Sequence, residues 1–157
     1  MQTAPDFESV LTQVRSKPLF RLVLRVGKPE SLGRRAVVLI DGGLFEGDRL
    51  NGTVDPGGTD WITSGPDGSL RFDVRLVLRT DDGETIGMTY SGYRHGAPEV
   101  ITRLNGGEPT DPSEYYFRTA PFFETASRKY DWLNRVVAIG IGERRPEGPV
   151  YCVHEVL

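Results

Sequence analysis

Cysteine and histidine are scarce in this sequence of 157 residues, which has one cysteine, Cys152, and two histidines, His95 and His154. A single cysteine excludes a disulfide within the chain and a cysteine-based zinc site. Two histidines exclude a site with three histidine ligands, and no carboxylate stands at metal-ligand spacing from either. We therefore expect no tightly bound metal, and the scarcity of cysteine favours a reducing compartment such as the cytoplasm.

Long apolar runs and runs of basic residues are also missing. No stretch approaches the roughly 20 apolar residues that span a bilayer, and the first residues do not combine a basic region with an apolar core, as an export signal would. The formal net charge is −3, and the arginines are scattered among acidic residues. We therefore expect neither nucleic acid nor a membrane as a partner.

Glycine is frequent, but not in the arrangements that bind nucleotides. Gly140-Ile141-Gly142 lacks the third glycine and the following helix of a dinucleotide-binding loop, and no Gly-Lys-Ser/Thr occurs for a phosphate loop. The Gly-x-Ser-x-Gly elbow of serine hydrolases is absent as well. We therefore expect no cofactor, and any chemistry must come from ordinary side chains.

Short β-rich segments bounded by Gly, Pro, Asn and Asp make up most of the chain. With 19 glycines and 11 prolines, the composition indicates many turns. We predict a single all-β domain over residues 1–157, an antiparallel β-barrel of about 8–10 strands, with a sandwich as the alternative. The expected strands lie near residues 18–26, 35–41, 48–54, 59–64, 69–80, 84–92, 115–120, 136–143 and 149–156.

Two segments depart from this strand pattern. Near the start, apolar residues recur at the i, i+3, i+4 and i+7 spacing of a helix, so residues 1–16 are predicted to form a short amphipathic N-terminal helical extension. The stretch from Tyr93 to Pro112 is irregular, and a loop of this length is typical of a lid, a rim or an interface element. The apolar positions of the predicted helix are Phe7, Val10, Leu11 and Val14.

Turn chemistry predicts which side chains share a face of the sheet. The segment Thr80–Glu84 fits a three-residue hairpin loop in which Gly83 takes the left-handed conformation. This register gives the two flanking strands one apolar face. The predicted opposite pairs are Val74 with Tyr90, Leu76 with Met88 and Leu78 with Ile86.

The preceding turn, from Ser64 to Ser69, is predicted to join its strands through an even number of residues. Trp61 then lies on the apolar face, whereas Asp60 lies on the opposite, polar face with Asp73 and Arg75. In one interpretation this polar face is the solvated outside, with surface ion pairs worth about 0–1 kcal/mol each. In the other it lines a cavity, where a carboxylate beside arginines holds an anionic or carbonyl ligand and acquires a shifted pKa.

Several motifs follow one another in the order typical of a known family. They are Gly33-Arg34-Arg35, Gly42-Gly43-Leu44-Phe45-Glu46-Gly47, Pro56-Gly57-Gly58-Thr59-Asp60-Trp61, Asp73-Val74-Arg75, Asp81-Asp82-Gly83, Tyr115-Tyr116-Phe117-Arg118-Thr119, Phe123-Glu124 and Tyr130-Asp131-Trp132-Leu133-Asn134. From about Leu19 to the C-terminus, the sequence resembles the family called domain of unknown function 3237. The resemblance implies a soluble antiparallel β-barrel of small microbial proteins with no general assigned activity. The N-terminal amphipathic segment looks like an addition to that pattern, and Leu76 stands where an aromatic residue is expected.

The polar residues of these motifs are the candidate site residues. Asp60 is the candidate catalytic proton carrier, with Arg75 and Arg118 as candidate anion stabilisers. Arg118 shares a strand face with Tyr116, and a guanidinium beside a phenol suits a carboxylate, enolate or phenolate. In the alternative interpretation, Arg118 has a structural role and forms an ion pair with an acid such as Glu124. The candidate binding residues are Trp61, Asp73, Arg75, Tyr116, Arg118 and Glu124.

Three functions are compatible with these residues. The first is an enzyme that performs cofactor-free acid/base chemistry, of lyase, isomerase or cyclase type, on a small aromatic or carbonyl compound. The second is a protein that binds a small molecule without turnover. The third is a homo-oligomeric structural protein, because the apolar side chains exceed what one small barrel encloses. The first two share a small-molecule ligand as the expected partner.

Overall fold

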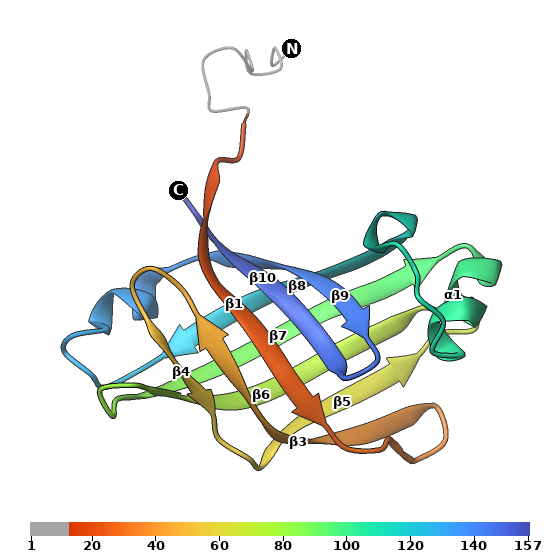
Figure 1. The fold of residues 1–157 in the computed structure, drawn as a ribbon, viewed down its shortest axis with the longest axis horizontal. Coiled ribbons are helices and arrows are strands. Elements are labelled where there is room, and N and C mark those ends of the chain that lie inside the picture. Colours follow the sequence, from red (N-terminus) through yellow and green to blue (C-terminus); the bar gives the residue numbers. More distant parts are fainter. Residues whose placement is uncertain (1–12) are drawn as a thin grey trace, which may run out of the picture.

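The computed structural model describes residues 13–157, whose ten β-strands form one antiparallel sheet that closes on itself (Figure 1). β1 pairs with β10 on one side and with β3 on the other, which closes the barrel. β4 and β5 both pair with β3 on one side and β6 on the other, so together they occupy one position in the barrel. The short β2 pairs only with β3 and is not counted, which leaves eight strand positions. The strands are β1 (Ser16–Val26), β2 (Glu30–Ser31), β3 (Arg35–Glu46), β4 (Asn51–Val54), β5 (Gly58–Ser64), β6 (Leu70–Thr80), β7 (Thr85–Gly96), β8 (Tyr115–Glu124), β9 (Ala138–Arg145) and β10 (Gly148–Val156).

All nine predicted strands are present, and the predicted β6–β7 register is confirmed. Gly83 has a φ of 88°, the left-handed conformation that the three-residue loop requires. Val74, Leu76 and Leu78 lie opposite Tyr90, Met88 and Ile86, as predicted. All six side chains are buried, so this face of the hairpin forms part of the barrel interior.

The predicted register of the β5–β6 turn is wrong by one residue. Ser64 pairs with Leu70, so the loop between them contains five residues and not an even number. Hydrogen bonds within the loop hold this length, because the Gly65 N–H donates to the Ser69 carbonyl and the Asp67 carboxylate accepts from the Ser69 N–H and hydroxyl. A shift of one residue moves every side chain of a strand to the other face. β5 therefore presents Asp60 to the interior and Trp61 to the outside.

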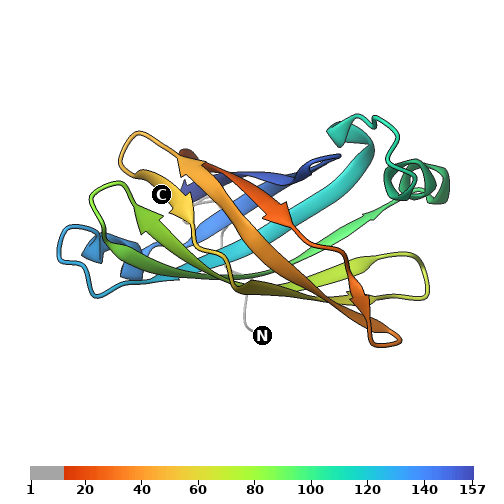
Figure 2. The ribbon, with the colours of Figure 1, turned by 60° about the horizontal axis from the view of Figure 1, so that its bottom comes forward.

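One α-helix, α1 (Pro98–Asn105), interrupts the stretch that was predicted to be irregular. Pro98 occupies the first turn, and Val100 and Leu104 are buried four residues apart on one face. Figure 1 and Figure 2 show α1 at one end of the barrel, beyond the ends of the strands. Two short 3-10 helices, η2 (Pro112–Glu114) and η3 (Asp131–Arg135), complete the described elements.

Most of the predicted N-terminal helix lies outside the described residues, because its apolar positions Phe7, Val10 and Leu11 belong to residues 1–12. Residues 13–15 have no regular secondary structure, and Val14 is 79% exposed. The prediction of a helix up to residue 16 is therefore wrong at its end, since β1 begins at Ser16. Within residues 13–157 no helix has the length and apolar character needed to cross a membrane.

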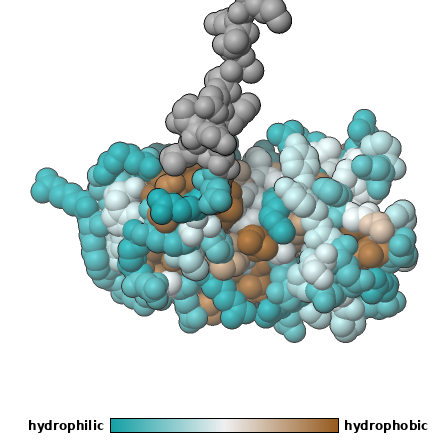
Figure 3. All heavy atoms as spheres, turned by 90° about the horizontal axis from the view of Figure 1, so that it is seen from above, coloured by the Kyte–Doolittle hydropathy of each residue, from teal (hydrophilic) through white to brown (hydrophobic). Residues whose placement is uncertain are grey.

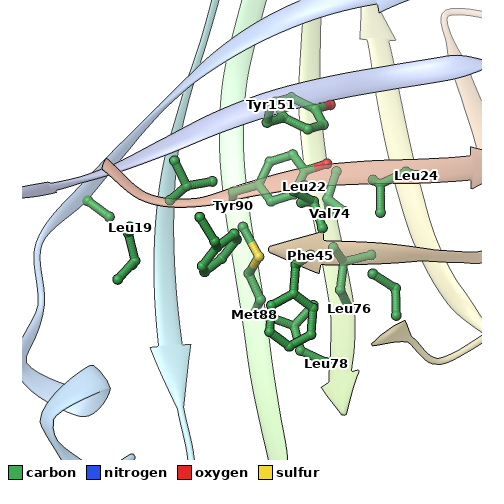
Figure 4. Close-up of a cluster of buried hydrophobic side chains, with 14 of the residues drawn as sticks. Leu19, Leu22, Leu24, Phe45, Val74, Leu76, Leu78, Met88, Tyr90 and Tyr151 are labelled. Atoms are coloured by element: carbon green, nitrogen blue, oxygen red, sulfur yellow. The ribbon is translucent and has the colours of Figure 1, made fainter. Parts of the chain in front are cut away.

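The barrel interior is filled with apolar side chains at the end away from α1. Phe45, Leu78 and Ile86 have no exposed surface there, and Met88 is 1% exposed. Figure 4 shows how side chains from β1, β3, β6 and β7 converge in this cluster. The outside is mainly hydrophilic on the face shown in Figure 3, with smaller apolar areas between polar ones. The end near α1 is organised differently.

Candidate functional site

A cavity of about 410 Å³ lies in the barrel at the α1 end. Volumes of this order are typical of sites for small organic molecules. The wall is mainly apolar and includes side chains such as Ile62, Phe72 and Phe117. Its polar side chains come from four strands and from α1: Asp60, Arg94, Asn105, Arg144 and Tyr151.

Asp60 brings an ionisable carboxyl group to this cavity. It lies opposite Val74 in the β5–β6 pair, and its Oδ1 is buried without a hydrogen-bond partner among residues 13–157. Burial raises the pKa of Asp60 from 3.8 to about 7, although a backbone hydrogen bond from Asp73 opposes the rise and the negative charge of Asp73 adds to it. Near neutral pH, both the protonated and the ionised carboxyl are therefore populated.

Arg94 places a second charge in the cavity wall. It follows Tyr90 and Gly92 on the inward face of β7 and is only 7% exposed. Its Nη2 donates to Asn105 Oδ1 at 3.2 Å, whereas its buried Nε has no partner among the described residues. Burial, together with the charge of Arg144, lowers the pKa of Arg94. A guanidinium remains charged in proteins, so the site holds a cation with a free donor.

Tyr151 lines the cavity, and Tyr90 packs against it on the side of the packed cluster. Their ring centroids are 5.4 Å apart, and Figure 4 shows the two side chains next to each other. Burial raises the pKa of both phenols, so both keep their protons near neutral pH. The charge of Asp60 raises the pKa of Tyr151, whereas Arg94 and Arg144 lower it. Tyr151 thus lies within electrostatic range of both the carboxyl group and the arginines.

Phe117 contributes an aromatic ring to the wall, and a glycine makes room for it. Its ring stacks on Phe72 with centroids 5.2 Å apart and meets Tyr151 edge-on at 5.4 Å. A Cβ atom at Gly142 would lie 2.6 Å from the Phe117 ring. Gly142 therefore lets the ring pack against the backbone of β9.

Three of the predicted site residues lie on the outside of the barrel. Trp61, Asp73 and Arg75 line a hollow on the outer surface together with Arg35 and Thr59. The Arg35 guanidinium lies 5.0 Å from the centre of the Trp61 ring, a cation–π contact. The predicted neighbourhood of Asp60 with Asp73 and Arg75 on one face is therefore wrong, because the odd β5–β6 loop separates them across the sheet.

The predicted residues of β8 are also on the outside. Tyr116 is 46% exposed, and the Arg118 guanidinium lies 5.2 Å from its ring centre, so these two share a face as predicted. Arg118 Nη1 donates to the Phe117 carbonyl at 2.9 Å. Within the described residues, Arg118 and Glu124 form no ion pair. Their predicted binding roles remain predictions, and none of the three lines the internal cavity.

The cavity residues Arg94, Asn105, Arg144 and Tyr151 were not predicted from the sequence. Arg94 could have been found, because it continues the inward alternation of Tyr90 along the same strand. Arg144 follows directly after a predicted strand. Asn105 lies on α1, inside the stretch that was predicted to be irregular.

No group of three His, Cys, Asp or Glu side chains comes together among residues 13–157 in a way that could hold a metal ion. Cys152 is exposed, and its Sγ lies 3.3 Å from His154 Nε2. Both residues belong to β10, and neither lines the cavity. The chemistry available in the cavity is that of a carboxyl group, two guanidinium groups, a phenol and an amide.

Together, the fold and the cavity define a small antiparallel β-barrel with an internal polar site. The chain belongs to the family described as protein of unknown function (DUF3237), whose family model matches residues 13–156. A UPF0311 protein of Clostridium acetobutylicum is 35% identical over 152 residues, which cover 93% of this chain and 96% of that protein. The crystal structure of a conserved protein of unknown function from Rhodopseudomonas palustris has a TM-score of 0.90 at 33% identity and covers 94% of this chain and 100% of that chain. The hydroalkoxylation enzyme phnH of Penicillium herquei is 34% identical over 106 residues, 68% of this chain and 56% of that protein.

Proposed function

We propose that the protein binds a small aromatic or carbonyl compound in the internal cavity and catalyses cofactor-free proton transfer of lyase, isomerase or cyclase type. Asp60 is the proton carrier in this proposal. The observation that carries it is the Asp60 carboxyl group, which lies at a cavity of about 410 Å³ and has one buried oxygen without a hydrogen-bond partner among residues 13–157. A catalytic acid or base works best when its pKa lies near the working pH, and burial brings that of Asp60 to about 7.

The surroundings of Asp60 suit either direction of transfer. The protonated carboxyl can deliver its proton to a carbon or oxygen atom of a bound molecule, and the ionised form can accept one. The hydroxyl of Tyr151, which burial keeps protonated, is a hydrogen-bond donor for negative charge that develops on oxygen during the reaction. The apolar wall around Phe72 and Phe117 accommodates an aromatic body.

The relative phnH supports the same class of reaction. Its name describes hydroalkoxylation, the addition of an alcohol O–H across a carbon–carbon double bond. Such an addition places a proton on carbon and removes one from oxygen, which a single carboxyl group of suitable pKa can assist. An intramolecular addition of this kind closes a ring, and its reverse is an elimination, so it belongs to the cyclase and lyase types.

Proton transfer can be tested directly in deuterium oxide. We would incubate the protein with phenylpyruvate, which has an acidic position beside a carbonyl group, and with 2-allylphenol, which can cyclise by hydroalkoxylation, and follow both by NMR. The expected result is deuterium incorporation or ring closure above the uncatalysed rate with at least one compound. Asp60→Asn should lower that rate by roughly 100-fold or more, the usual size of a general acid–base contribution.

The control is Asp41→Asn, which removes an exposed carboxyl group on β3. This variant should keep the full rate. Turnover that survives in folded Asp60→Asn contradicts the role of Asp60. No reaction with either compound, combined with binding of either, would favour the alternative function, a protein that holds a small molecule without converting it.

A further inference from the structure

Two arginines in the cavity wall have no acidic partner within the described part of the chain. Neither Arg94 nor Arg144 takes part in any ion pair among residues 13–157. Most of the ion pairs in this part of the chain do involve an arginine. Arg144 Nη1 donates to the carbonyl of Arg145 at 2.6 Å. The cavity thus contains two positive charges, and its one carboxyl group, on Asp60, lies beyond ion-pair distance of both.

The burial of Arg94 makes its missing partner informative. With 7% of the surface of Arg94 exposed, the guanidinium has lost most of its hydration. Among residues 13–157, its Nε has no acceptor, and its only side-chain acceptor is the neutral amide of Asn105. An unpaired buried charge destabilises a folded protein, and a bound anion removes that cost. Arg144 also lines the cavity but is exposed, so its charge adds to the attraction for an anion without itself needing a buried partner.

The remainder of the wall indicates what kind of anion fits. Apart from its few polar groups, the cavity is lined by aliphatic and aromatic side chains, including Val38, Leu70 and Phe72. An inorganic oxyanion would leave these surfaces in contact with water. An organic anion covers them with its apolar body while its charged oxygen meets the guanidinium groups.

We propose that Arg94 and Arg144 form an anion subsite, and that the molecule bound in the cavity carries a carboxylate, phenolate or enolate on an apolar body. Asn105, from α1, positions Arg94 through their hydrogen bond. With its anionic oxygen on the arginines, the molecule extends past Tyr151 toward Asp60. This inference deepens the proposed function, on which it rests for the choice of the cavity as the site, but it concerns recognition and not proton transfer.

The test compares an organic anion with its neutral counterpart. We would measure the dissociation constants of 1-naphthoate and 1-naphthamide by calorimetry, with thermal stabilisation as a second readout, for the wild-type protein, Arg94→Met and Arg144→Met. The wild-type protein should bind 1-naphthoate at least roughly tenfold more tightly than 1-naphthamide, as expected for a charge-assisted hydrogen bond. Each variant should weaken naphthoate binding by roughly tenfold or more and leave naphthamide binding nearly unchanged.

The matched control is Arg71→Met, which removes an exposed arginine from the outer face of β6 at the same end of the barrel. This variant should bind 1-naphthoate as the wild-type protein does. Equal affinities for the anion and the amide, or naphthoate binding that Arg94→Met does not weaken, would overturn the proposal. Stabilisation by inorganic phosphate as large as that by 1-naphthoate would also overturn it, because it would show an oxyanion site without preference for an apolar body.

The two proposals can fail separately. Asp60→Asn removes a negative charge from the cavity and should bind 1-naphthoate as tightly as the wild-type protein or more tightly. If this variant retains both binding and turnover, the proton-carrier role is wrong and the anion subsite stands. If Arg94→Met retains naphthoate binding while Asp60→Asn loses turnover, the subsite is wrong and the proton-carrier role stands.

Discussion

The two ends of this barrel are built from the same strands but have different interiors. Away from α1, Phe45, Leu78 and Ile86 fill the interior with no exposed surface. At the α1 end, the inward positions of the same sheet carry Asp60 and Arg94, and a cavity of about 410 Å³ remains open. One end therefore provides the packing that holds the barrel together, and the other tolerates polar groups that a packed core would exclude.

This difference separates stability from function along the barrel axis. Apolar contacts at the packed end fix the register of β6 and β7, so the positions of side chains at the cavity end follow from the same strands. The cavity end can then hold a carboxyl oxygen and a guanidinium N–H that find no partner in the part of the chain that the structure describes, each of which lowers stability by itself. Functional sites commonly depend on such locally unfavourable groups, held in place by a stable remainder of the fold.

The largest predicted effect is at the packed end. Phe45→Ala should lower the free energy of unfolding by about 3–5 kcal/mol, because it removes a fully buried ring that packs against Phe20 with centroids 5.5 Å apart. Urea unfolding followed by circular dichroism would measure this loss. The comparison is Phe117→Ala, which removes a ring that is also buried but lines the cavity. This variant should cost at least about 1 kcal/mol less, because the side of the ring that faces the cavity has no packing partner to lose. Equal losses would show that the two ends are packed alike.

The next effect concerns the pH dependence of stability at the cavity end. The pKa of Asp60 rises from 3.8 to about 7 on folding because of burial. Between these values the folded state holds more protons than the unfolded state, so the free energy of unfolding falls as the pH rises, by at most roughly 4 kcal/mol. Asp60→Asn cannot titrate and should lack this loss. The variant should match the wild-type protein near pH 4 and be more stable at pH 8.

The measurement is the difference in unfolding free energy between the wild-type protein and Asp60→Asn, followed from pH 4 to pH 8. The other titrating groups are common to both proteins, so they largely cancel in the difference. Asp41→Asn, at the exposed position on β3, serves as the control. A difference that stays constant over this range would show that Asp60 is as well hydrated as an ordinary surface carboxyl group.

The same contrast explains how far the sequence could predict the structure. The β6–β7 register was predictable because Asp81-Asp82-Gly83 specifies its own loop length and the flanking strands alternate regularly. All nine strands were predictable for a similar reason, since Gly, Pro, Asn and Asp mark their ends. These features are local, and they were sufficient for the barrel and its packed end.

The cavity end was harder to predict because its strands break the hydrophobic pattern. An inward Trp61 and an outward Asp60 agree with the usual burial preferences, yet the fold places Trp61 outside beneath Arg35 and Asp60 inside. Nothing in Ser64–Ser69 decides between loops that differ by one residue, and the hydrogen bonds that settle it are visible only in three dimensions. Arg94 also breaks the hydrophobic pattern. A charged residue at an inward position looks like the end of a strand, so the predicted strand stopped before Arg94.

The smallest of these effects tests how the cavity wall is shaped. In Gly142→Ala, the new Cβ would lie 2.6 Å from the Phe117 ring, which Phe72 and Tyr151 hold from other sides. Since the ring has little room to move except toward the cavity, we expect a loss of about 1–3 kcal/mol in unfolding free energy. In Gly87→Ala, on the same sheet, the nearest atom would lie 3.6 Å away, so stability should change by less than about 0.5 kcal/mol. If Gly142→Ala weakens 1-naphthoate binding and Gly87→Ala does not, Phe117 has moved into the cavity. Equal stability of the two variants would contradict the prediction, because it would show that the Phe117 ring moves aside without cost.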